Sequence, residues 1–346
     1  MGDIFKLLLT TDNVVKYWEE TRKDRPPFKS EMFFPRRKQL GLNFSFIKGK
    51  GGLPIALVAS NFDVDVLYRD RIGVEETLGE LPFFKEAYKI TEKLRQDIIT
   101  TRDEYRSYLL TNVFDGTNDL IDGAEVTPNI MRNQLLSLGT IAISENGVAK
   151  EYNYGFDQSK QLKTVTTSWT DAGADPIADI LKYKREYKNL THMEAKYLYA
   201  NESLMDQLLT NAKIVEHFNK LPVPEYATLE KVTAYIESVT GLMIVLDNAE
   251  YISARDTTKT PKYYYPENRF TLLGTLDLGE TLYGTTPEEI DLMNSSAVNS
   301  CRVINTGVAI TSWDEVDPVH TIIKASEVVA PTCPNIDKIF IVKTVK

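Results

Sequence analysis

The sequence predicts an α+β fold, in which helices and strands are mixed without the regular alternation of a doubly wound sheet. Three observations favour it: two glycine-containing hairpin signals, long stretches with helical spacing of apolar residues, and a tail rich in β-branched residues. The 346 residues are 42% hydrophobic and 26% charged, which suffices for one large or two ordinary domains.

The first thirty residues predict an arm. A short amphipathic stretch, residues 4–18, ends in a break at residues 21–27, which include Pro26 and Pro27. We expect this segment to lie apart from the core.

An extended hairpin is expected next. The strand-like runs 42–47 and 53–59 are separated by Lys48-Gly49-Lys50-Gly51-Gly52, whose glycines permit the positive φ of a reversal. Strands of ten residues would reach about 33 Å, beyond the parent domain. The apolar side chains of this hairpin would then need a partner surface; they include Phe44, Phe46, Ile55 and Leu57.

Two helices and a second hairpin should follow. Apolar residues within 91–113 recur at helical spacing, and a second helix is predicted to begin at Thr127-Pro128 and end at Gly139. Residues 140–144 and 148–154 flank Asn146-Gly147, a strong hairpin signal.

The remaining chain predicts further helices and strands. Helices are expected after Asp175-Pro176, over 228–241 and after Thr286-Pro287, and strands over 242–246 and 263–273. The tail from residue 307 favours strands, and the last of them, 338–343, should close a sheet.

Composition narrows the classes of function. With 40 basic against 49 acidic residues, the net charge of −9 argues against tight DNA binding. No run of about 18 apolar residues predicts a membrane span, and no secretory signal is expected. Cys301 and Cys333 suggest neither a disulfide framework nor a zinc site, and a reducing cytoplasm fits them.

The sequence predicts no catalytic, cofactor-binding or metal-binding residues, and hence no enzyme. The glycines at 49–52 lack phosphate-loop spacing, and His192, His217 and His320 lie outside metal-binding motifs. Asp63 and Asp65 would share one strand face, which favours a solvated face over paired catalytic carboxylates. Two alternatives stay open: a Ser-His-Asp hydrolase whose residues form no recognisable sequence motif, and another enzyme built on an α+β scaffold.

Two basic clusters, residues 36–38 and 68–71, are candidates for contacts with other molecules. Arg36, Arg37, Arg69 and Arg71 could bind phosphate, but in a net-acidic chain we favour pairing with acidic groups of a neighbouring subunit. The run 263–265 of three tyrosines would anchor an interface or alternate across a strand.

The order and spacing of several segments resemble the lambda-type major capsid proteins of tailed bacteriophages, which share the Hong Kong 97-type capsid fold. The matching segments extend over most of the chain: residues 33–38 with 42–48, 62–64 with 69–73, 81–86, 134–139, 152–156, 169 with 174–177, 283–289, 307–311 and 317–318.

This resemblance implies five regions. They are an N-terminal arm (1–32), an extended loop (33–80), a peripheral domain with a long spine helix (81–140), an axial domain (141–300) and a return to the peripheral sheet (301–346).

It also implies a function without catalysis. Many copies would form pentamers and hexamers of an icosahedral shell around double-stranded DNA, with no sequence-specific DNA contact. A portal, a scaffolding protein and a decoration protein would be partners, assembly would occur in the bacterial cytoplasm, and the virion would be the final location. A cargo-enclosing nanocompartment of the same fold is the alternative. The expected contacts between subunits use Arg36, Arg37, Phe44, Phe46, Lys48, Lys50, Ile55, Leu57, Arg69 and Arg71.

Overall fold

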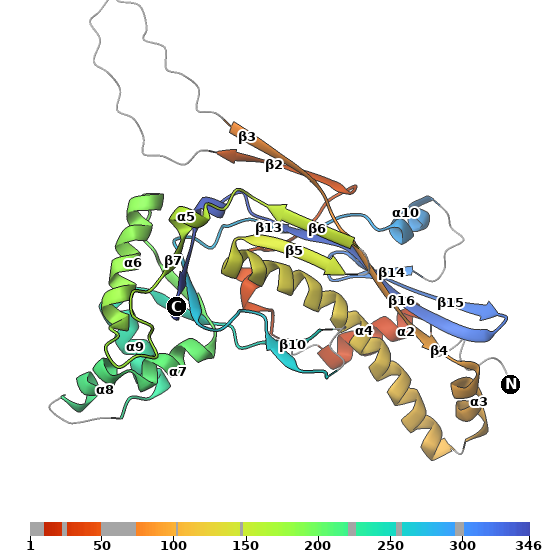
Figure 1. Cartoon of the computed structure of the whole chain (residues 1–346). Helices are drawn as coiled ribbons and strands as arrows, with labels where there is room; N and C mark the ends of the chain where they lie inside the picture. Colours follow the sequence, from red (N-terminus) through yellow and green to blue (C-terminus); the bar gives the residue numbers. More distant parts are fainter. Residues whose placement is uncertain are drawn as a thin grey trace, which may run out of the picture.

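The chain folds around two sheets joined by one long helix (Figure 1). The computed structural model describes residues 10–22, 26–49, 74–101, 103–145, 148–220, 226–253, 258–294 and 301–346. The predicted α+β class is confirmed.

The first sheet has six strands: five follow the order β1-β13-β16-β15-β14, and β4 pairs with residues 321–328 of β16. Its long strands are β15 (Val308–Val316) and β16 (Val319–Thr332), which form an antiparallel hairpin, as the β-branched tail predicted. β4 (Phe83–Ile90) and β13 (Glu280–Tyr283) add antiparallel to β16. β1 (Arg36–Lys38) pairs parallel with β13, and β14 (Cys301–Ile304) pairs with β15.

The helix α4 (Asp103–Leu138) lies along the first sheet and contacts β16 and β4 (Figure 1). It includes Pro128, so the expected helix start at Thr127 is wrong, although the end before Gly139 is confirmed. The expected helix over 91–113 is also interrupted, because α3 (Glu92–Thr100) ends and α4 begins three residues later. A proline inside a helix costs about 3 kcal/mol. Burial of Met131, Leu135 and Leu136 just beyond it offsets that cost.

The N-terminal helix α2 (Thr11–Arg22) packs against α4 and β14. Val14 and Trp18 are buried, and the indole Nε1 of Trp18 donates to Asp122 Oδ1 of α4 at 3.0 Å. For these residues the expectation of an arm apart from the core is wrong, because the apolar stripe of the helix is covered by the chain's own α4.

The second sheet has five strands in the order β7-β17-β12-β8-β9. They are β7 (Leu162–Thr164), β17 (Ile339–Lys343), β12 (Arg269–Leu273), β8 (Tyr197–Ala200) and β9 (Met243–Leu246). The C-terminal strand β17 lies inside this sheet, between β7 and β12. The chain therefore leaves the first sheet after β16 and ends in the second.

Helices cover the second sheet: α6 (Pro176–Thr191), α7 (Glu202–Thr210), α8 (Ala212–Asn219) and α9 (Leu229–Thr240). The predicted start of α6 is confirmed, since the Asp175 side chain accepts a hydrogen bond from Ala178 N. The end of α9 is confirmed at Gly241, which has a φ of 65°. Trp169 stacks on Phe270 with ring centroids 5.4 Å apart, which fixes the core between these layers.

The expected strand over 263–273 is two strands, β11 (Pro261–Tyr263) and β12. β11 pairs with β10 (Glu250–Ile252) in a separate two-stranded sheet. Tyr265 lies between them, buried, with its hydroxyl 2.8 Å from Thr271 Oγ1. The short elements are η1 (Lys29–Met32), α5 (Gln158–Gln161) and η2 (Ile336–Lys338).

Of the two predicted hairpins, the one around Asn146-Gly147 is confirmed. The other has its first strand where expected, but that strand pairs with residues 74–80, and the expected second strand, 53–59, lies outside the described residues. β5 (Thr140–Glu145) pairs with β6 (Val148–Asn153). β2 (Asn43–Gly49) pairs with β3 (Val74–Glu80), and this pair leaves the body of the molecule (Figure 1).

The helix α10 (Pro287–Asn294) begins with a capping box, as the sequence predicted. Thr286 N donates to Glu289 Oε2 at 2.8 Å, and Glu289 N donates to Thr286 Oγ1 at 3.3 Å. Thr286→Ala should lower the free energy of unfolding by about 1 kcal/mol. Thr228→Ala is the matched control, because Thr228 caps α9 without a side-chain hydrogen bond. Urea unfolding of both variants checks this, and equal losses would contradict it.

Candidate functional site

The base of the β2–β3 hairpin is fixed to the body by an aromatic contact. Phe44 is 3% exposed and lies opposite Gly79 in the strand pair. A Cβ added at Gly79 would stand 2.4 Å from Phe44 Cζ, so the glycine makes room for the ring. The expectation that Phe44 needs a partner surface is therefore wrong, because its own subunit buries it.

The neighbouring β6 strand supports the same base. The hydroxyl of Tyr152 donates to the carbonyl oxygen of Glu80 at 2.8 Å, and its ring lies 6.4 Å from that of Phe44. Burial, together with the nearby charge of Glu80, raises the pKa of Tyr152 to about 12. Lys150 Nζ is 3.2 Å from Glu80 Oε2. The hairpin thus leaves the body in a direction set by β6.

Of the other residues expected at the hairpin, Phe46 and Lys48 lie in β2, in register with Thr77 and Glu75. Lys50, Ile55, Leu57, Arg69 and Arg71 lie outside the described residues.

The first basic cluster makes ion pairs within its own subunit. Arg37 Nη1 lies 2.8 Å from Glu280 Oε2, and its side chain is 64% exposed. Lys38 Nζ lies 2.6 Å from Glu289 Oε1. Arg36 is largely buried between Glu31 and Glu125. Arg37 is therefore the member of this cluster that presents most of its charge to other molecules.

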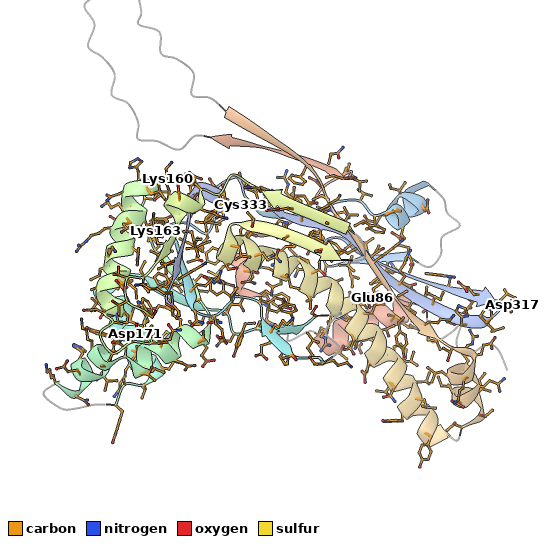
Figure 2. All side chains as sticks on the ribbon, viewed as in Figure 1. Glu86, Lys160, Lys163, Asp171, Asp317 and Cys333 are labelled. Atoms are coloured by element: carbon orange, nitrogen blue, oxygen red, sulfur yellow. The ribbon has the colours of Figure 1, made fainter. Side chains whose placement is uncertain are left out.

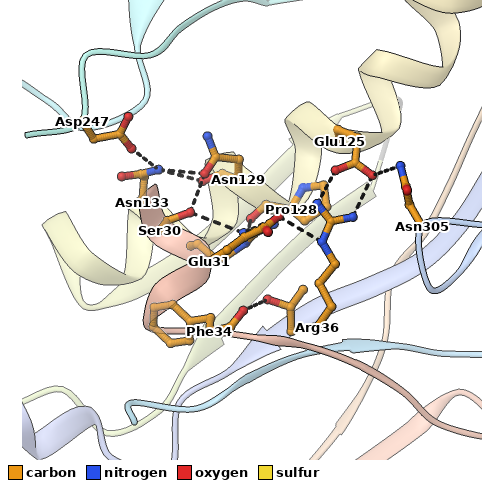
Figure 3. Close-up of polar contacts among 12 residues, drawn as sticks. Ser30, Glu31, Phe34, Arg36, Glu125, Pro128, Asn129, Asn133, Asp247 and Asn305 are labelled. Carbon is orange, nitrogen blue, oxygen red and sulfur yellow. Dashed lines mark hydrogen bonds and ion pairs between the residues drawn. The ribbon is translucent and has the colours of Figure 1, made fainter. Parts of the chain in front are cut away.

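A largely buried polar network runs from the second sheet through α4, and Figure 3 shows its part from Asp247 to Asn305. Its members are Tyr199, Asp247, Asn133, Asn129, Ser30, Arg132, Glu31, Arg36, Glu125 and Asn305. The Tyr199 hydroxyl of β8 donates to Asp247 Oδ2 at 2.6 Å and also contacts Asn133 Oδ1 of α4 at 3.0 Å. Asn133 Nδ2 donates to Asn129 Oδ1 at 3.2 Å, and Ser30 Oγ donates to the same oxygen at 2.5 Å. Burial, and then the charge of Asp247, raises the pKa of Tyr199 well above its usual range.

The network continues to the first sheet through two guanidinium groups. Arg132 is fully buried, and its Nη1 lies 3.2 Å from Glu31 Oε1. Arg36 bonds the same carboxylate and, through Nη1, Glu125 Oε1 at 2.9 Å. Asn305 Nδ2 donates to that Glu125 oxygen at 2.9 Å. Burial works to lower the pKa of Arg36, but the hydrogen bonds to Glu125 and Glu31 raise it overall.

Two groups of the first sheet lie beside these charges. Glu327 of β16 is 1% exposed and Tyr283 of β13 is fully buried. Burial raises the pKa of Glu327 well above its usual range; Glu125 adds to the shift, while Arg36 and Arg132 oppose it. Burial likewise raises the pKa of Tyr283.

Sequence reasoning missed this network. The available signal was Glu327 itself, an acid in the otherwise apolar end of β16, where Val328, Val329 and Ala330 follow. A buried carboxyl group requires a neighbour or a proton. Its partners are distant in sequence, so pattern alone did not assemble them.

Among the described residues, no three His, Cys, Asp or Glu side chains are grouped to hold a metal ion. No helix in that part of the chain is long and apolar enough to cross a membrane. His217 stacks on Tyr235 at 4.2 Å, and His320 Nε2 lies 2.7 Å from Glu315 Oε2 across the β15–β16 turn. That turn, with Asp317, is the end of the first sheet farthest from α6–α9 (Figure 2).

No protein-family model matches the sequence, and no curated protein matches it. Solved structures do match the fold. A prophage protein of Escherichia coli CFT073, assigned as a capsid protein, superposes with a TM-score of 0.61 at 16% identity over 96% of this chain and 98% of its own. A phage-related protein from Bordetella bronchiseptica RB50 gives 0.54 at 11% identity, over 95% and 96%.

The capsid of cyanophage A-1(L) gives a TM-score of 0.50 at 11% identity, over 93% of this chain and 94% of its own. These matches extend over nearly the whole chain on both sides. The chain therefore has the Hong Kong 97-type phage capsid fold.

Proposed function

We propose that this protein is the major capsid protein of a tailed bacteriophage, a subunit that assembles with copies of itself into a DNA-enclosing shell. The observation that supports this best is the fold, which agrees over 96% of this chain with the prophage protein assigned as a capsid protein. The lambda-type relationship and the arrangement in pentamers and hexamers are parts of the same proposal.

The hairpin supports the proposal by its construction. Phe44 and Tyr152 fix its base to the body, while the strands of β2 and β3 lead away from it. A segment that is anchored so firmly, yet extends beyond its own core, is suited to contact a second copy. The contacts proposed there use Phe46, Lys48, Lys50, Ile55, Leu57, Arg69 and Arg71.

Arg37 is proposed as a further contact, because most of its side chain is exposed beside Glu280. Arg36 has its role inside the subunit. Many such weak contacts, repeated around a closed shell, give a stable particle.

The division into domains follows as a proposal. The extended loop (33–80), the peripheral region with α4 (81–140) and the axial region (141–300) would occupy successive positions in the shell. The N-terminal segment (1–32) would join the peripheral region through α2, and the return (301–346) would join it up to β16, since β17 ends in the second sheet. A portal, a scaffolding protein and a decoration protein would complete the particle, which assembles in the bacterial cytoplasm and becomes the virion.

Cross-linking of isotopically mixed subunits tests the hairpin contact. Particles assembled from ¹⁴N- and ¹⁵N-labelled chains should give mixed-isotope lysine cross-links from Lys48 or Lys50. Only same-isotope links from Lys48 and Lys50 would contradict a contact between copies.

A further inference from the structure

Beside the two guanidinium groups of the polar network lies the carboxyl group of Glu327, for which no counter-charge is left. Glu31 and Glu125 bond the guanidinium groups of Arg36 and Arg132. Two guanidinium groups thus face three carboxyl groups once Glu327 is included. Among the described residues, Glu327 Oε2 has no hydrogen-bond partner, and neither has Arg132 Nη2.

The charged and titratable groups around Glu327 come from α4, β1 and β13. α4 contributes Glu125 and Arg132, β1 contributes Arg36, and β13 contributes the Tyr283 hydroxyl, which also has no hydrogen-bond partner among the described residues. The strand neighbours in register with Glu327 are apolar, Val308 on β15 and Phe84 on β4. An ionised Glu327 would therefore place an extra negative charge in a buried site that already contains Glu125.

We propose that Glu327 is a proton-controlled latch at the junction of α4, β1, β13 and β16, which is closed while the carboxyl group holds its proton and loosens when the group ionises. The closed state is the one in the structure, with both arginines held by Glu31 and Glu125. Burial favours the neutral form of Glu327 and raises its pKa.

Loosening of the contacts around Glu327 would be transmitted through β1 to the β2–β3 hairpin. Arg36 belongs to the segment that leads from η1 into the β2–β3 hairpin, and its bonds to Glu31 and Glu125 hold that segment on α4 (Figure 3). The latch is a property of the single subunit. Its use in adjusting contacts between shell subunits rests on the proposed function.

The direction of the pH dependence follows from the raised pKa. Below the ordinary glutamate value of 4.5 the folded and unfolded chains both hold this proton, and the stabilisation is fully present. Above it, only the folded chain holds the proton, so the unfolding equilibrium constant rises about tenfold per pH unit until the folded pKa is passed. The subunit thus loses stability as pH rises towards the folded pKa, and the latch itself loosens once that pKa is passed.

Urea unfolding of the full chain between about pH 5 and 8 tests this, with Glu327→Gln as the variant. Glutamine keeps the shape of the neutral acid and cannot ionise. The ratio of the wild-type to the variant unfolding constant should rise with pH, about tenfold per pH unit, and level off where the folded pKa is passed. Glu280→Gln, an exposed carboxyl group on the adjacent β13, should run parallel to the wild type. Parallel profiles for the wild type and Glu327→Gln would overturn the proposal.

Infrared spectroscopy of the wild-type chain gives a second test that needs no variant. A carbonyl band of a protonated carboxylic acid should persist near pH 7, where exposed carboxylates are ionised. Absence of that band overturns the latch. If the chain shows the band and the pH profile but never assembles, the latch stands and the proposed function is refuted. If the chain forms shells but shows no band, the proposed function stands and the latch is refuted.

Discussion

Deleting residues 49–52 is expected to leave a folded subunit that no longer forms shells. The base of the hairpin is held by Phe44, Gly79 and Tyr152, all on the body side of the deletion. The contacts that hold the base, from Phe44 to Tyr152 and from Tyr152 to Glu80, lie outside the deleted residues. The deletion therefore removes a surface offered to a neighbour and little of the subunit's own packing.

Thermal unfolding and electron microscopy together measure the two halves of this expectation. The midpoint of unfolding of the isolated subunit should stay close to that of the wild type, while particles are lost. Normal shells from the deleted chain would refute the role given to the hairpin. A large drop in the midpoint would show that the hairpin supports its own core instead.

Replacing Arg36 by methionine is expected to destabilise the subunit by about 3–5 kcal/mol, because it leaves Glu125 buried beside Glu327 with no guanidinium partner on β1. The adjacent Arg37→Met variant is the matched control. Arg37 forms an exposed pair with Glu280, and surface pairs contribute little.

Chemical unfolding of the two variants gives the comparison. Adding Glu125→Gln to Arg36→Met should recover part of the loss, since the uncompensated carboxylate is then removed. Equal stabilities for Arg36→Met and Arg37→Met would contradict the buried network. A double variant no better than the single one would assign the loss to packing rather than charge.

The local features of the fold were predictable from the sequence because their causes are local. The caps at Asp175 and Thr286, the end of α9 at Gly241 and the β5–β6 hairpin each depend on residues within a few positions. The partner of β2 was not predicted, because the glycines at 49–52 favoured a second strand at 53–59, whereas β2 pairs with residues 74–80.

The continuity of α4 through Pro128 was not predictable in this way. Thr127-Pro128 has the local pattern of a helix start, and only the burial of Met131, Leu135 and Leu136 against residues distant in sequence overrides it. The docking of α2 and the burial of Phe44 were not predicted for the same reason, since their partners Asp122 and Tyr152 are distant in sequence.

In the candidate site, too, features with local causes were predictable and features that depend on distant partners were not. The exposed Arg37 could be proposed from a basic cluster, whereas the pairing of Arg36 and Arg132 with Glu31 and Glu125 required η1, β1 and α4 to meet. A sequence shows that Glu327 is an acid among apolar residues, but not which charges surround it.

Negative-stain electron microscopy combined with size-exclusion chromatography tests the central claim most directly. The protein would be expressed alone and together with the products of neighbouring genes. We predict shells, tubes or ring-shaped capsomers eluting well ahead of the 39.3 kDa chain. A stable monomer under every condition would contradict the proposal that this chain builds a capsid.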